Sequence, residues 1–113
     1  IRAGANINAA NENGVTALHV AAARGQVETS QVLVGAGADV HATTKDGFTP
    51  LHLSARQGHV DVSQMLVAVG ADVRAKDGDG MTPLDLAKQE GHTTFIALLQ
   101  ESVPLTKSAA QGG

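Results

Sequence analysis

Residues 46–52, which read DGFTPLH, place an aspartate, a hydroxyl and a histidine within one short segment. An imidazole that takes the proton of a Ser or Thr hydroxyl, supported by a carboxylate, makes an activated nucleophile. However, His19, His52 and Asp85 are evenly spaced along the chain, so the same position recurs at a fixed interval. A catalytic base needs partners that converge on one point, whereas these candidates recur along a line. We therefore expect His52 to be a scaffold residue that hydrogen-bonds locally at a helix start, and we expect no catalytic site.

Metal and cofactor sites receive no support from the remaining polar residues. The five histidines form no HxxxH or HExxH pair. The segment 76–80, KDGDG, is similar to part of a calcium-binding loop, but Ala75 and Leu86 would occupy the first and last ligand positions of that loop. Gly35 and Gly37 lack the third glycine of a dinucleotide-binding fingerprint. Because the chain also has no cysteine, we expect neither a cofactor nor a metal.

The composition indicates one domain with an aliphatic core. The chain has 113 residues, 42% of them hydrophobic, with no Trp or Tyr and only two Phe. Its net charge of −3 and the aspartates among its basic residues argue against a nucleic-acid partner. No apolar run approaches the roughly 18 residues that span a bilayer, so we expect no membrane partner. The first residue is Ile, which suggests a processed or excised segment, and we expect an intracellular protein, cytoplasmic or nuclear.

The chain repeats itself at a fixed interval. Asn-Gly or Asp-Gly pairs stand at 13–14, 46–47 and 79–80, and threonines, leucines and glycines follow them at the same interval. Nine of the thirteen glycines lie on this grid. A regular period of about 33 residues predicts a stacked repeat array, in which neighbours bury the faces that one unit cannot bury alone.

The unit 37–69 predicts a turn, a short helix, a second turn and a second helix. Asp46-Gly47 favours a tight turn. Thr49 can cap the first helix, with Pro50 at its first position, and Gly58 can end it with a positive φ. The second helix is expected over 59–68. Its apolar face is made by residues at i, i+3, i+4 and i+7, which are Val62, Met65, Leu66 and Val69.

The stretches DGFTPLHLSARQGHVDVSQMLVAVGADV and DGMTPLDLAKQEGH resemble the ankyrin repeat, with its TPLH-like helix start and GADVN-like lead-in. The resemblance covers residues 4–102. It implies an all-α repeat solenoid of ankyrin repeats, in which β-hairpin turns stand at a right angle to antiparallel helix pairs. It also implies a structural role for the TPLH histidine and protein binding by the array.

The resemblance divides the chain into repeats that differ at their ends. The face of repeat 1 made by Leu18, Val20 and Val27 is expected to be partly open. Either the chain is a piece of a longer array, or another surface covers this face. Repeat 3 is expected to be a C-terminal cap, because Gln100 replaces the valine of the other repeats. The predicted boundaries are 1–3 for the end of a truncated preceding repeat, 4–36, 37–69 and 70–102 for repeats 1, 2 and 3, and 103–113 for a flexible tail.

Equivalent positions in stacked repeats form rows, and one row is Val15, Phe48 and Met81. The resemblance implies that this row lies on the hairpin and inner-helix side, where ankyrin arrays bind proteins. An exposed apolar strip there would mark a contact site. The alternative is that these side chains fold under the hairpin and contact one another. The predicted partner-binding residues are Val15, Arg24, Lys45, Phe48, Arg56, Gln57, Met81 and Gln89.

Charge changes along the same side of the array. Arg24 and Arg56 end the first helices of adjacent repeats, whereas Glu90 takes the Arg24 position in repeat 3. A partner with an apolar anchor and an acidic group near repeats 1 and 2 would match this face. The alternative is ordinary solvated charge.

The sequence therefore predicts a non-enzymatic protein–protein interaction module that binds another protein. The alternative is a structural spacer or a self-association segment of a larger multidomain protein, with self-association through the open first repeat. Asn8 and His41 share a hairpin position, and the resemblance implies that an oxygenase can hydroxylate this position.

Overall fold

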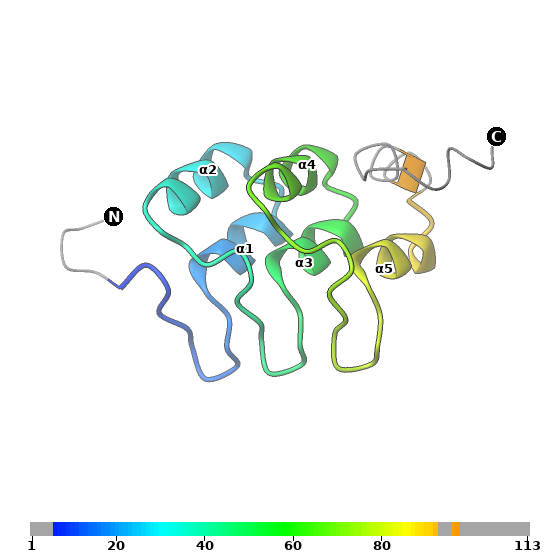
Figure 1. Ribbon diagram of the computed structural model, residues 1–113, viewed down its shortest axis with the longest axis horizontal. Helices are drawn as coiled ribbons and strands as arrows, with labels where there is room; N and C mark the ends of the chain where they lie inside the picture. The colour runs from blue at the N-terminus through cyan, green and yellow to red at the C-terminus, as the bar shows by residue number, and fades with distance from the viewer. Residues whose placement is uncertain (1–5, 93–95, 98–113) are drawn as a thin grey trace.

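The computed structural model describes residues 6–92 and 96–97. Within residues 6–92, five helices follow one another: α1 (Ala17–Ala23), α2 (Val27–Gly35), α3 (Pro50–Arg56), α4 (Val60–Ala68) and α5 (Pro83–Gln89). Figure 1 shows α1, α3 and α5 side by side in an inner row, with α2 and α4 in an outer row. A loop precedes each inner helix and extends away from the outer row (Figure 1). We call these loops fingers, and they comprise residues 6–15, 37–48 and 70–81.

The inner helices all begin with the same reciprocal cap. The N-cap residue is Thr16, Thr49 or Thr82, and its side chain accepts the backbone N–H three residues later. The side chain three residues later accepts the threonine N–H in return, which is a capping box made with histidine or aspartate in place of glutamate. Gly58, with φ +76°, directly follows the C-cap of α3. These contacts confirm the predicted start and end of this helix.

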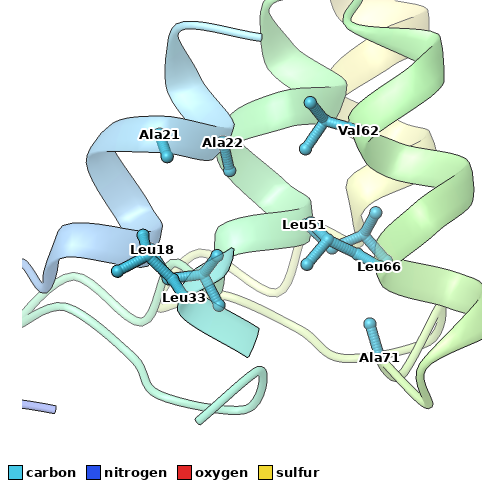
Figure 2. Close-up of a cluster of buried hydrophobic side chains, with 8 residues drawn as sticks. All are labelled: Leu18, Ala21, Ala22, Leu33, Leu51, Val62, Leu66 and Ala71. Atoms are coloured by element: carbon cyan, nitrogen blue, oxygen red, sulfur yellow. The ribbon is translucent and has the colours of Figure 1, made fainter. Parts of the chain in front are cut away.

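The core is aliphatic and is shared between repeats (Figure 2). It confirms that stacking buries what one repeat cannot, because residues of repeats 1 and 2 belong to one cluster. Burying a leucine of this cluster stabilises the fold by about 2 kcal/mol. The members of the cluster are Leu18, Ala21, Ala22, Leu33, Leu51, Val62, Leu66 and Ala71.

Two expectations about apolar faces are wrong in part. Leu18 is only 1% exposed, so it does not belong to an open face of repeat 1, although Val20 is 40% exposed. Val27 is half-buried against the core. Val69 is 45% exposed, and it is the C-cap of α4 rather than part of the helix.

The fingers are turns rather than paired β-strands within residues 6–92. In repeat 2, Thr44 N–H donates to the Phe48 carbonyl at 3.0 Å, and the Thr44 hydroxyl accepts the N–H groups of Asp46 and Phe48. The polar side chain therefore takes N–H groups that a strand ladder would use. Neighbouring fingers are joined by single backbone bonds, such as the 2.9 Å bond from Lys45 N–H to the Asn13 carbonyl.

Some predictions fall on residues outside the described ranges. These are the segment 1–3, the polar replacement at Gln100 in repeat 3, and the tail 103–113. They stay predictions.

Candidate functional site

His52 has the scaffold role predicted for it. Its Nδ1 accepts the Thr49 N–H at 3.1 Å, and its Nε2–H donates to the Met81 carbonyl of the next repeat at 2.8 Å. A carbonyl oxygen can only accept, which assigns the proton to Nε2. The side chain is 0% exposed. With both ring nitrogens bonded and no solvent access, this imidazole has no free position from which to take a substrate proton.

His19 makes the same bonds one repeat earlier. Its Nδ1 accepts the Thr16 N–H at 3.0 Å, and its Nε2–H donates to the Phe48 carbonyl at 2.9 Å. Burial lowers the pKa of His19 below 6.5, and the carbonyls of Phe48 and Ala42 oppose this shift only in part. The neutral ring is therefore the form that the fold stabilises.

Asp85 replaces these histidines in repeat 3. Its carboxylate accepts the Thr82 N–H at 3.0 Å, and this backbone bond, followed by the Thr82 hydroxyl, lowers the pKa of Asp85 below 3.8. An ionised carboxylate is an acceptor only, so Asp85 cannot donate to a carbonyl as His19 and His52 do.

Two further histidines connect the repeats, and the sequence reasoning did not predict them. His59 Nε2–H donates to the Ala23 carbonyl at 3.1 Å, and His92 Nε2–H donates to the Arg56 carbonyl at 2.9 Å. The His59 ring occupies the space that a side chain at Gly25 would need, and the His92 ring occupies the space that a side chain at Gly58 would need. The signal was present, because His59 and His92 are one period apart and each follows a grid glycine.

The KDGDG segment is a turn. The Asp77 side chain is buried, and its carboxylate accepts the N–H groups of Asp79 at 2.8 Å and Met81 at 3.0 Å. In the part of the chain that the structure describes, no group of three or more His, Asp or Glu side chains is placed to hold a metal ion.

Val15, Phe48 and Met81 are the last residues of the fingers, Lys45 lies in the turn of the second finger, and the other predicted partner-binding residues stand at the ends of the inner helices. Val15, Phe48 and Met81 are each half-buried, which is intermediate between an exposed strip and a strip folded under the fingers. Arg56 is also half-buried. The other predicted residues are exposed, and they are Arg24, Lys45, Gln57 and Gln89.

The structure brings Phe48 and Arg56 together. The guanidinium carbon of Arg56 lies 5.1 Å from the centroid of the Phe48 ring, within the range of a cation–π contact. The His52 ring meets Phe48 edge-on, with centroids 6.0 Å apart. His52 and Arg56 are four residues apart on one side of α3, and Phe48 directly precedes the N-cap Thr49 of this helix. The equivalent residues are valine, histidine and alanine in repeat 1 and methionine, aspartate and glutamine in repeat 3.

Both neighbouring repeats fix the backbone of this pair. The Phe48 carbonyl accepts from His19 of repeat 1, and the Arg56 carbonyl accepts from His92 of repeat 3. Phe48 and Arg56 therefore stand on a backbone held from both sides.

Asn8 has a structural contact at the position for which hydroxylation was predicted. Its side-chain oxygen accepts the Asp39 N–H at 2.6 Å, and its amide donates to the Gly37 carbonyl at 3.2 Å. His41 occupies the same position in repeat 2 and is exposed. Hydroxylation at either residue stays a prediction.

Comparison with known families agrees with this architecture. The model for ankyrin repeats in three copies matches residues 1–77 and 32–109. No curated protein matches the chain. Among the described residues, every helix is too short or too polar to cross a membrane. Ankyrin repeats are generally non-enzymatic modules for protein–protein interaction. With its repeated caps, glycine-ended helices and stacked core, the chain belongs to the ankyrin-repeat family.

Proposed function

We propose that this chain is a non-enzymatic protein-binding module of an intracellular protein, and that its partner docks on the finger and inner-helix side over repeat 2. The observation that supports this is the Phe48–Arg56 pair, whose backbone is held by His19 and His92. Aromatic residues, Phe among them, and arginine are enriched at protein–protein interfaces. A partner that docks on a fixed pair loses little ordering entropy, which favours affinity.

Self-association through repeat 1 is less well supported. In repeat 2, His59 and Val62 stand at positions that contact the preceding repeat, and Val62 is buried in the shared core. The equivalent residues of repeat 1 are Gln26 and Thr29, which are polar and exposed. A second copy would meet neither the histidine donor nor the buried valine. Light scattering over a concentration series should therefore give a constant mass, and a mass that grows with concentration would favour self-association.

Affinity capture from a native lysate tests the proposed face. We expect Phe48→Ala to lose proteins that the unchanged chain captures, because the ring would anchor the partner. Val32→Ala is the matched control, since Val32 is 62% exposed on the outer helix α2 and should not affect capture. Circular dichroism would verify that both variants keep their helical content. The same captured proteins with Phe48→Ala, or none with the unchanged chain, would contradict the proposal.

A further inference from the structure

We infer that the partner presents a carboxylate to Arg56, and that its charge changes from acidic over repeats 1 and 2 to neutral or basic over repeat 3. This inference rests on the proposed function, because it specifies the chemistry of a partner on the same face. Three observations carry it: the unused donors of Arg56, the fixed position of this residue, and the order of charges along the inner helices.

Arg56 has donors that the described part of the protein does not use. Its guanidinium lies over the Phe48 ring, which contacts the cation but offers no lone pair to the five N–H donors. Among residues 6–92, no carboxylate oxygen lies within 4.0 Å of this group. A carboxylate can accept two of these N–H groups in parallel, which is the arrangement that the planar guanidinium fits best. An acidic side chain of a partner therefore completes the hydrogen bonding of Arg56.

The position of Arg56 reduces the cost of this contact. Its side chain is half-buried against Phe48, and its carbonyl is bonded to His92 of the next repeat. An arginine that is free in solvent must lose rotamer freedom when it binds. Because Arg56 is already placed against a ring, less of this freedom remains to be lost.

The C-caps of the inner helices give the face a direction. They are Arg24, Gln57 and Glu90, all exposed, so this row is positive in repeat 1, neutral in repeat 2 and negative in repeat 3. In the second finger, the exposed Lys45 stands beside the exposed Asp46, and in the first finger Glu12 holds the position of Lys45, so the direction of charge comes from the C-cap row. A segment with the opposite order of charges is attracted in one orientation and repelled in the other.

Peptide selection on the purified chain tests the inference. A random twelve-residue display library would be selected on the unchanged protein, and the best peptide would be synthesised. We expect enriched peptides to combine a large apolar residue with a nearby Asp or Glu, followed by neutral or basic residues. Binding of the synthetic peptide, measured by fluorescence anisotropy, should weaken as salt is added.

Charge variants then locate the acidic group. Arg56→Gln should weaken binding of that peptide about tenfold or more, because it removes the charge and the paired donors. Glu28→Gln is the control for a changed charge, since Glu28 is exposed on the outer helix α2, away from the fingers and inner helices, and it should leave affinity unchanged. The double variant Arg24→Glu with Glu90→Arg should weaken the selected peptide and favour one with the reverse order of charges.

The outcomes separate the two levels of the proposal. If no peptide is enriched on the unchanged chain relative to Phe48→Ala, the proposed function fails and the inference fails with it. If enriched peptides require Phe48 but lack acidic residues, or bind Arg56→Gln as tightly as the unchanged chain, only the carboxylate inference is overturned.

Discussion

Replacing Gly25 by alanine tests the contact that holds repeats 1 and 2 together at their helix–helix turns. Gly25 has φ +73°, and a Cβ added there would lie 2.7 Å from Nδ1 of His59 and 2.9 Å from two ring carbons. The ring cannot move away freely, because its Nε2–H donates to the Ala23 carbonyl at 3.1 Å. The substitution therefore introduces backbone strain and also displaces an inter-repeat hydrogen bond.

The two costs have separate magnitudes. A non-glycine residue in the left-handed region costs about 1–2 kcal/mol, and a lost hydrogen bond costs about 0.5–1.5 kcal/mol. Gly25→Ala should therefore lower the free energy of unfolding by about 1.5–3.5 kcal/mol. Gly91→Ala is the matched control, because Gly91 has φ +77° and no described atom lies within 4 Å of an added Cβ. It should cost only the strain, about 1–2 kcal/mol.

Urea unfolding followed by far-ultraviolet circular dichroism measures both variants, provided that the m-value is unchanged. In a His59→Ala background the obstructing ring is absent, so Gly25→Ala should cost no more than Gly91→Ala costs in the unchanged chain. This is a double-mutant cycle with a non-additive result. Equal losses for the two glycines, or full additivity with His59→Ala, would refute the reasoning.

Ser30→Ala should raise the free energy of unfolding by about 1 kcal/mol, because the Ser30 hydroxyl is buried without a hydrogen-bond partner among the described residues. Ser63→Ala should lower it, since Ser63 bonds Ser54 at 2.6 Å, and urea unfolding that reversed either sign would contradict this. The folded-state pKa of His19 lies below the unfolded value of 6.5, so its contribution to stability is present above pH 6.5 and is lost as the pH falls toward the lowered pKa. His19→Gln should remove that part of the pH dependence of thermal unfolding, and an unchanged dependence would argue against it. The folded-state pKa of Asp85 is also lowered, so its contribution is present above pH 3.8 and is lost as the pH falls through the folded value. A carboxyl titration by NMR that gave a pKa of 3.8 or higher would disagree.

The repeat period and the helix ends could be predicted from the sequence because their causes are local. Thr49 and Pro50 begin a helix, and Gly58 ends it, whatever the rest of the chain does. The role of His52 followed from its repetition at the period of the fold rather than from its chemistry.

The finger conformation was not predicted, because it depends on competition for backbone N–H groups. Asn11, Thr44 and Asp77 share one position in the repeat, and each accepts two backbone N–H groups of its own turn. Their types differ, but all are short polar acceptors that favour such turns. If these three equivalent positions had been compared by side-chain chemistry rather than by residue identity, their shared role in the turns could have been predicted.

The predicted face was identified only as a set of rows. The period indicated that Phe48 and Arg56 were in neighbouring rows, but the contact between them depends on side-chain rotamers and on the shape of α3. Likewise, the bonds from His59 and His92 join residues 36 apart, so they cross from one repeat to another and are invisible within one unit.

The histidine bonds give repeat 2 a position that its neighbours do not share. The inner-helix histidines donate forward along the array, to the carbonyls of Phe48 and Met81, whereas His59 and His92 donate backward. Of these four histidine bonds, repeat 1 therefore accepts only one from a later repeat, and repeat 3 accepts only one from an earlier repeat. Repeat 2 accepts both, and it does so at Phe48 and Arg56. His19 and His92, from the two neighbouring repeats, thus hold in place the pair on which we expect a partner to dock.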